Sequence, residues 1–172
     1  MAPVIEQDKG IHDQRGRTGM IPSKRVAKKA GKTTQVAALC YRVTKKQKCE
    51  ILLVTSRGTG RWIPPKGWMM KGKPPHKAAA IEAFEEAGVK GEVSPVSLGR
   101  YRFNREGENK VANCSREAYI FPLYVEKLAT KYKEQGERKV KWFTPKKAAM
   151  LVREPKLKKM IRRFDPSEIA FQ

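Results

Sequence analysis

Residues 67–89 read GWMMKGKPPHKAAAIEAFEEAGV: a Pro/Gly-rich loop runs into an alanine-rich segment that ends in glutamates and a glycine. A Pro-Pro pair precedes the alanines and Gly88 follows the last glutamate by two positions. Proline at the start of a helix and glycine just past its end are the usual boundary signals. The sequence therefore predicts a helix from about His76 to Ala87, entered from a stiff loop.

Three glutamates, Glu82, Glu85 and Glu86, lie three and four residues apart near the end of this helix. Side chains at that spacing are neighbours, and like charges there repel by about 0.2–0.5 kcal/mol per pair. The helix dipole also disfavours anions in the last turn. A hard cation with oxygen ligands would relieve both penalties. The triplet therefore indicates a metal site, although alone it is also typical of an ordinary acidic helix end.

The other side chains of the helix indicate how it packs. Ala78 and Ala79 share the face of the carboxylates, so nothing bulky crowds them. Ala80, Ile81 and Phe84 lie on the opposite side, where we expect them to pack on a sheet.

The loop before the helix favours the metal hypothesis. Residues 62–67 read WIPPKG, in which the prolines stiffen the backbone and Gly67 lets it approach a ligand closely. Such a loop can offer main-chain carbonyl oxygens to the cation that the carboxylates bind.

Strand-forming runs surround this segment, and short helical patterns close the chain. The expected strands are Gln35–Val43, Glu50–Ser56, Arg61–Ile63, Glu92–Phe103, Arg116–Val125 and Lys139–Phe143, and the expected helices are Pro145–Val152 and Pro155–Phe164. Strands interleaved with a few helices predict a mixed α/β sandwich. We expect one domain over residues 34–172.

The net charge of +21 in 172 residues is the outlying feature of the composition. Such a field attracts polyanions, including nucleic acid and phosphorylated small molecules, although part of it is a solvated surface. Residues 1–33 hold eight Lys and Arg against three acids and few aliphatics, which predicts a flexible basic tail. No apolar run is long enough to cross a bilayer and no hydrophobic leader is visible, so we expect a cytoplasmic protein.

Residues 67–89 resemble the Nudix box, whose pattern is G-x5-E-x7-R-E-U-x-E-E-x-G-U with U aliphatic. Gly67 opens the pattern, and the run from Glu82 to Val89 closes it in register. Lys73 and Ile81 depart from it, standing where the family has a Glu and an Arg that are salt-bridged to each other. Losing both charges leaves neither unpaired, and we expect Ile81 to brace the loop by packing.

The resemblance extends over roughly residues 35–164. The runs VAALCYRV, EILLVTSR, RWIPPKGW, EEAGVKGEV and KVKWF are similar to the diphosphoinositol polyphosphate phosphohydrolase branch of the Nudix hydrolases. That branch has a Gly-rich loop where this chain has PKGW. The resemblance implies a Nudix-like α/β/α sandwich with a mixed β-sheet.

The resemblance also implies roles for the residues of the box. It implies that Mg²⁺ or Mn²⁺ is held by Glu82, Glu86 and a main-chain carbonyl of Lys66 or Gly67, and that Glu85 is the general base. Neighbouring carboxylates titrate as a coupled set, so the roles of Glu85 and Glu86 could be exchanged.

Cationic side chains are expected to hold the substrate. The resemblance implies substrate contacts for Arg57, Arg138 and Lys156, and Arg61 adds charge at the loop. The branch's basic stretch entering the first strand is absent, because residues 33–35 read TTQ. We therefore expect a substrate with fewer phosphates than an inositol pyrophosphate.

The expected function is hydrolysis of a phosphoanhydride in a polyphosphorylated small molecule, such as a diphosphoinositol polyphosphate or a dinucleoside polyphosphate. The alternative is a non-catalytic or RNA-directed module that binds polyanions, with RNA held through the basic tail. The lost Glu/Arg pair and the high charge favour the alternative. Oligomeric state cannot be predicted from the sequence.

Overall fold

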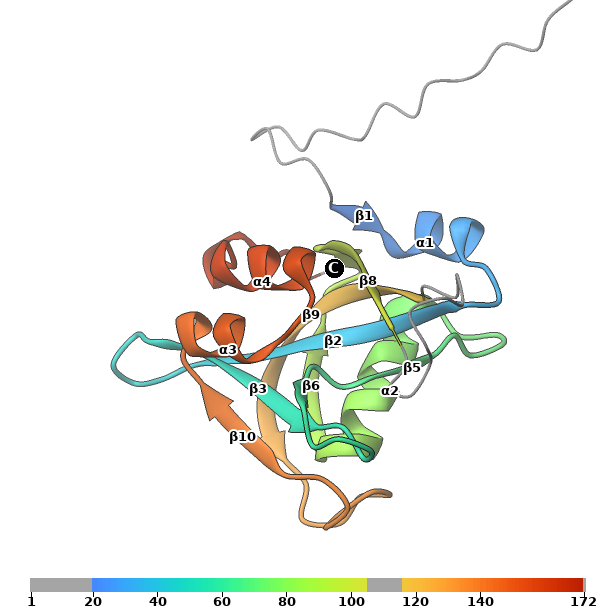
Figure 1. Ribbon diagram of the computed structural model, residues 1–172. Helices are drawn as coiled ribbons and strands as arrows, with labels where there is room; N and C mark the ends of the chain where they lie inside the picture. Colours follow the sequence, from blue (N-terminus) through green and yellow to red (C-terminus); the bar gives the residue numbers. More distant parts are fainter. Residues whose placement is uncertain (1–19, 105–115, 172) are drawn as a thin grey trace, which may run out of the picture.

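The computed structural model describes residues 20–104 and 116–171, which form a mixed sheet between two layers of helices (Figure 1). Along the sheet the strands lie in the order β10 (Val140–Phe143), β3 (Cys49–Thr55), β2 (Thr34–Val43), β9 (Arg116–Leu128) and β6 (Val89–Val93). Three further strands extend the sheet: β4 (Trp62–Ile63), β5 (Lys66–Trp68) and β8 (Gly99–Phe103) pair with β3, β2 and β9. β2 and β9 are parallel and the other pairs are antiparallel.

Each face of the sheet carries its own core. Side chains alternate along β2, so Val36 and Ala38 face α2 (Pro75–Ala87), whereas Ala37 and Leu39 face the other layer. That other layer holds α3 (Pro145–Leu151), α4 (Pro155–Arg162) and the 3₁₀ turn η1 (Pro166–Glu168). The predicted α/β/α sandwich is confirmed. Among the described residues, no helix is long and apolar enough to cross a membrane.

The end of the predicted tail is part of the fold. Residues 20–33 form β1 (Ile21–Pro22), which pairs with β7 (Val96–Ser97), and α1 (Ser23–Lys29). Val26 of α1 is fully buried beside the α2 layer and Ile21 of β1 packs against the same core, so two apolar side chains anchor a segment that is otherwise basic. The rest of the predicted tail, residues 1–19, lies outside the described residues, and so does the RNA binding expected of it.

The structure differs from the predicted strands around residues 92–103. The expected single strand is three short ones, β6, β7 and β8, separated near Pro95 and at Gly99, whose φ is 137°. Proline cannot donate to a sheet ladder, and glycine allows the unusual backbone angle. β5, which lies inside the Pro/Gly-rich loop, was not predicted because its three residues are too short for a periodic signal.

The helix α2 begins and ends within one residue of the prediction, and Gly88 follows it with a φ of 68°. Its packing face was predicted wrongly. The buried side chains are Ala78, Ala79, Ala83, Glu86 and Ala87, rather than Ile81 and Phe84. Small side chains let the helix backbone lie close to the sheet, and this brings Glu86 against β5.

Candidate active site

The three residues of β5 face two different parts of the molecule. Side chains alternate along a strand, so Lys66 and Trp68 point to one face and Gly67 to the other, where α2 lies. A Cβ at Gly67 would overlap the carboxyl group of Glu82. Gly67 is therefore required by the close approach of the glutamate.

Glu86 lies at the end of α2 and is buried between two donors. Its Oε2 accepts a 3.3 Å hydrogen bond from the Lys66 backbone N–H, and its Oε1 lies 3.2 Å from Nη2 of Arg138. Burial raises the pKa of the Glu86 carboxyl to about 7, although the Arg138 guanidinium opposes the rise. Keeping the Glu86 carboxylate ionised at this buried position therefore costs free energy unless a cation lies beside it.

The other two glutamates of the triplet are less enclosed. Burial, and then the neighbouring charge of Glu85, raise the pKa of Glu82. Glu85 is partly exposed and its Oε2 lies 2.8 Å from Nζ of Lys133. The three carboxylates therefore occupy different environments: Glu86 is buried, Glu82 lies against Gly67 and Glu85 is partly exposed.

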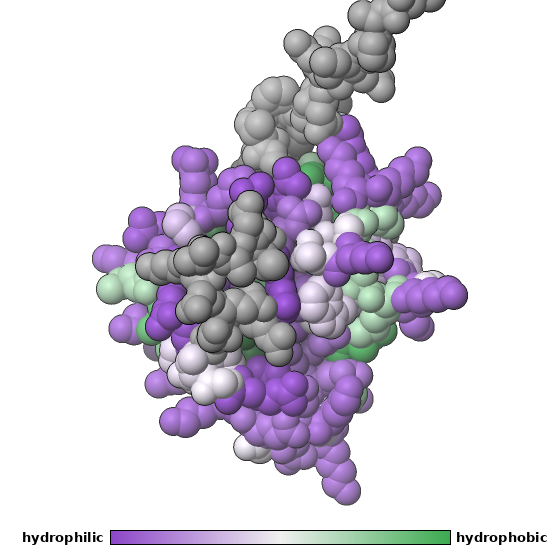
Figure 2. Space-filling view, turned by 45° about the vertical axis from the view of Figure 1, so that its right-hand side comes forward, coloured by the Kyte–Doolittle hydropathy of each residue, from purple (hydrophilic) through white to green (hydrophobic). Residues whose placement is uncertain are grey.

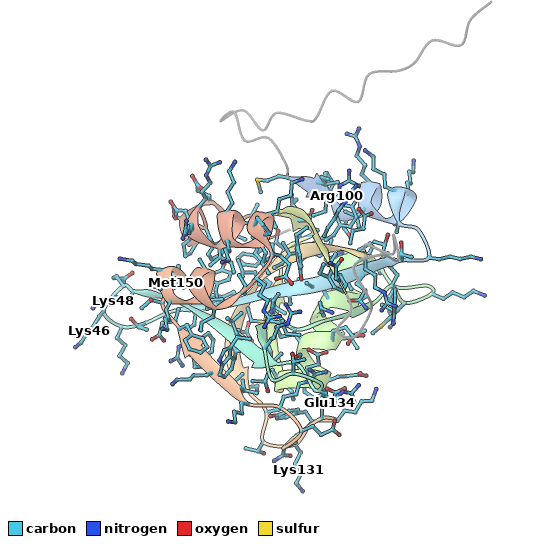
Figure 3. The ribbon with its side chains drawn as sticks, viewed as in Figure 1. Lys46, Lys48, Arg100, Lys131, Glu134 and Met150 are labelled. Atoms are coloured by element: carbon cyan, nitrogen blue, oxygen red, sulfur yellow. The ribbon has the colours of Figure 1, made fainter. Side chains whose placement is uncertain are left out.

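Residues 129–138, between β9 and β10, hold the end of α2. The Ala129 N–H donates to the Gly88 carbonyl at 2.7 Å, and the Glu134 N–H donates to the Glu85 carbonyl at 3.0 Å. Glu134 therefore lies beside the end of the helix, as Figure 3 also shows. This segment also supplies Lys133 and Arg138, whereas the last turn of α2 contains no basic residue of its own.

Arg138 was predicted to bind substrate, but its guanidinium is enclosed by protein acceptors. Its Nε lies 2.6 Å from Glu134, its Nη1 donates to the Thr55 carbonyl at 3.0 Å, and its Nη2 contacts Glu86. Its side chain is 7% exposed. The geometry makes Arg138 a support for Glu86 and Glu134.

The remaining predicted cations lie in three places. Arg57 is exposed near the 129–138 segment, where its Nη1 is 3.4 Å from Glu137. Arg61 is largely buried and lies 3.3 Å from Glu154. Lys156 is not brought to the carboxylates: it lines a separate cavity of about 680 Å³ between α4, β1 and β8, which also contains Arg100, Lys159 and Arg163.

The Lys66 side chain makes contacts across the sheet that its place in the Pro/Gly-rich loop did not reveal. Its Nζ donates to Gln35 Oε1 at 3.0 Å and lies 4.2 Å from the centre of the Phe103 ring. Burial lowers the pKa of Lys66, while the Glu86 and Glu154 carboxylates oppose the shift. Lys133 and Glu134 were missed as well, because the run KYKEQGER has no spacing that marks a site. The Glu134–Arg138 pair, four residues apart, was the available signal.

The residues that the structure brings together fit a divalent cation by their chemistry. No cluster of three His, Cys, Asp or Glu side chains is preformed within residues 20–104 and 116–171. However, Glu82 and Glu86 meet at the β5 backbone, and burial raises the pKa of both carboxyls. A cation there would favour their charged forms and accept a backbone oxygen, which suits Mg²⁺ or Mn²⁺.

Lys73 and Ile81 do not brace the loop by an ion pair. Lys73 is exposed in a turn, and its N–H donates to the Met70 carbonyl at 3.1 Å. The loop is instead held by the pairing of β5 with β2 and by Met69 and Met70, which pack against the α2-side core. Met69 and Met70 thus brace the loop by packing, whereas the packing expected of Ile81 stays a prediction.

Comparison with known proteins gives a consistent result. The family model described as NUDIX domain matches residues 33–164. Diphosphoinositol polyphosphate phosphohydrolase 3-alpha of Mus musculus is 35% identical over 112 residues, which cover 63% of this chain and 62% of that protein. The match therefore spans less than two thirds of that relative's length.

Solved structures share the fold at lower identity. The dihydroneopterin triphosphate pyrophosphohydrolase of E. coli matches with a TM-score of 0.59 and 16% identity, over 77% of this chain and 94% of that one. The Ap4A hydrolase of C. elegans, in a binary complex, matches with a TM-score of 0.50 and 20% identity, over 75% of this chain and 92% of that one.

Proposed function

The chain belongs to the Nudix family, and from this premise we propose that it is a metal-dependent hydrolase cleaving a phosphoanhydride bond in a polyphosphorylated small molecule. The proposal rests on one observation: Glu82 and Glu86 both approach the backbone of Lys66 and Gly67. We assign the activity to residues 34–172, with β1 and α1 packed on them.

Glu82 and Glu86 would hold Mg²⁺ or Mn²⁺ together with a main-chain carbonyl of Lys66 or Gly67. The N–H and C=O of one strand residue point to the same edge, and the Lys66 N–H points to Glu86. The main-chain carbonyl oxygen of Lys66 thus also points toward the carboxylates, where it can bind the cation. The cation would polarise phosphate oxygens and make the attacking water more acidic.

Glu85 would accept the proton of the attacking water, because its side chain is 30% exposed, whereas that of Glu86 is 7% exposed. Lys133, 2.8 Å from its Oε2, would stabilise the carboxylate before the transfer. Glu86 could exchange roles with Glu85, since the two are adjacent residues at the end of α2. Arg138 would keep Glu86 in position in either case.

The substrate class follows from charge and from the names of related proteins. Arg57, Arg61 and the Lys66 ammonium are cations of the described chain near β4 and β5 that could clamp phosphates. Lys156 would contribute only to a substrate long enough to reach the second cavity. The similar mouse protein is named for a diphosphoinositol polyphosphate, and the nematode structure for Ap4A. Both compounds contain the phosphoanhydride that we propose is cleaved.

The test is release of phosphate or nucleotide from a panel of phosphoanhydrides with Mg²⁺ and with Mn²⁺. We expect Glu86→Gln to lower kcat at least about 100-fold, as expected when an electrostatic group of the site is removed. Glu126→Gln, on the exposed part of β9, is the matched control and should keep full activity. Full activity of Glu86→Gln would refute the proposal.

A second candidate is a module that binds polyanions without turnover. The observation that favours it is the cavity of about 680 Å³, where Lys156, Lys159, Arg163 and Arg100 outnumber the acids Asp165 and Glu168. Hydrophilic side chains also dominate the face of the molecule in Figure 2. This candidate predicts RNA affinity that falls steeply with salt and survives Glu82→Gln combined with Glu86→Gln.

A further inference from the structure

The cavity of about 680 Å³ is built where α4, β8 and β1 meet (Figure 1). Its volume falls within the range of pockets that bind small molecules, about 300–1,000 Å³. None of the glutamates Glu82, Glu85 and Glu86 lines it. The cavity is therefore separate from the carboxylates of α2, and its own lining decides which ligand it fits.

Much of this lining is apolar. Six apolar side chains line the cavity, and each of them is only partly buried: Met20, Ile21, Leu98, Met160, Phe164 and Ile169. Ile21 packs against the α2-side core, whereas Leu98, Met160 and Phe164 pack against the core under α3 and α4. Leaving apolar surface in contact with water costs about 25 cal/mol per Å². A ligand with an apolar body would cover the part that the two cores leave exposed.

One face of α4 brings three cations to this apolar lining. Lys156, Lys159, Met160 and Arg163 follow the spacing of a single helix face. Like charges three and four residues apart repel, and Lys156 lies in the first turn, where the helix dipole disfavours a cation. Within the described part of the chain, none of the three cations forms an ion pair. An anion bound in the cavity would relieve both penalties.

The excess of positive charge suits one anionic group rather than a polyphosphate. Arg100 of β8 also lines the cavity, but it is already paired with Glu117 at 3.1 Å. The acids Asp165 and Glu168 line the cavity as well, and Asp165 accepts hydrogen bonds from the N–H and hydroxyl of Ser167 at 2.9 and 2.7 Å. Each further negative charge on a ligand would add repulsion from these two carboxylates.

We propose that this cavity binds an anionic amphiphile, a molecule with one carboxylate-like group on an apolar body, such as a fatty-acid anion. The anionic group lies beside Lys159 and Arg163, and the apolar body covers Leu98, Met160 and Phe164. This binding site goes beyond the proposed hydrolase function, because it uses neither a metal ion nor the carboxylates of α2.

The test is calorimetric titration of the full chain, in EDTA, with three probes: octanoate, 1-octanol and acetate. 1-Octanol has the apolar body without the charge, and acetate has the charge without most of the apolar body. Octanoate should bind at least about tenfold tighter than either of the other two, because it alone satisfies both parts of the lining.

Two sets of variants separate the contributions of charge and apolar surface. Lys159→Gln combined with Arg163→Gln should weaken octanoate at least about tenfold and leave 1-octanol affinity unchanged, which also shows that the cavity is intact. Lys158→Gln combined with Arg162→Gln, on the same helix but outside the lining, is the matched control and should bind octanoate like the wild type. Met160→Gln should weaken octanoate and 1-octanol alike, whereas Met160→Leu should retain both.

Absence of octanoate binding would overturn the proposal, as would acetate or 1-octanol binding as tightly as octanoate. An equal loss of octanoate affinity in the two double variants would also overturn it, because the effect would then come from general surface charge. Glu82→Gln combined with Glu86→Gln should leave octanoate affinity unchanged. Failure of the proposed hydrolase activity is therefore distinguishable from failure of this site.

Discussion

The guanidinium of Arg138 lies 3.2 Å from Oε1 of Glu86, and both side chains are 7% exposed. Two charges removed from water are stable only when their geometry and remaining hydrogen bonds are good. Here Arg138 also binds Glu134 and the Thr55 carbonyl, and Glu86 also binds the Lys66 N–H. A residue 52 positions away in the sequence thus holds the Glu86 carboxylate of the candidate site in place.

Arg138→Met should destabilise the fold by about 3 kcal/mol, because it leaves the buried Glu86 carboxylate without its cation. Urea denaturation measures the change. Adding Glu86→Gln should recover part of the loss, since one uncompensated charge is then removed. The exposed Arg57 is the control, and Arg57→Met should cost no more than about 0.5 kcal/mol. Similar losses in the two single variants would contradict the role given to Arg138.

The response to metal should depend on pH through Glu86. Without metal its pKa is raised from 4.5 to about 7, so the folded state binds this proton more tightly than the unfolded state. The associated stability is present below about pH 4.5 and is lost as the pH rises through 7. Mg²⁺ competes with the proton, so its stabilising effect should grow over the same interval.

Thermal unfolding between pH 5 and 8, in EDTA and in Mg²⁺, measures this coupling. The difference between the two melting temperatures should increase with pH for the wild-type chain. In Glu86→Gln it should be small and nearly constant. A difference that is equally large at pH 5 and pH 8 would exclude Glu86 as the coupled group.

Gly67→Ala should impair the site more than the fold. The added methyl group overlaps the carboxyl of Glu82, which can rotate away because it is the end of a flexible side chain. We expect stability to change by less than about 1 kcal/mol and Mn²⁺ affinity to fall at least tenfold, because one ligand is displaced. At Gly31 a Cβ would meet only the Thr34 hydroxyl, at 4.0 Å, so Gly31→Ala should leave Mn²⁺ affinity unchanged.

Restoring the family's charges at positions 73 and 81 should have little effect. The loop is held by β5 pairing and by Met69 and Met70, and an exposed ion pair adds at most about 1 kcal/mol. The variant Lys73→Glu with Ile81→Arg should keep kcat within about threefold of the wild type. Met70→Ala should cost about 1–2 kcal/mol by removing core contacts. A large gain of rate in the first variant would show that the loop is poorly anchored.

Sequence patterns predicted the features that depend on local chemistry. The helix α2, its Gly88 stop and the strand runs were visible because proline, glycine and periodicity act over a few residues. Val26 and the three residues of β5 were missed, because one buried side chain or one short strand gives no period. The packing face of α2 was predicted wrongly because the bulkiest side chains were expected to face the sheet. The close approach of the helix to the sheet requires alanines instead.

For the candidate site, too, the sequence predicted the features that depend on local spacing. The spacing of Glu82, Glu85 and Glu86 with Gly67 identified the carboxylates that meet the β5 backbone. The partners of those carboxylates could not be found in this way. Lys133 and Arg138 reach the helix through the path of the chain after β9, which depends on tertiary packing rather than on any local pattern.

The most direct test of the metal site is Mn²⁺ binding, followed by electron paramagnetic resonance as the ion is titrated into the protein. We expect the wild-type chain to bind Mn²⁺, and Glu82→Gln combined with Glu86→Gln to lower this affinity at least about 100-fold. Glu126→Gln should bind like the wild type. Unchanged Mn²⁺ affinity in the double variant would contradict the assignment of Glu82 and Glu86 as the metal ligands.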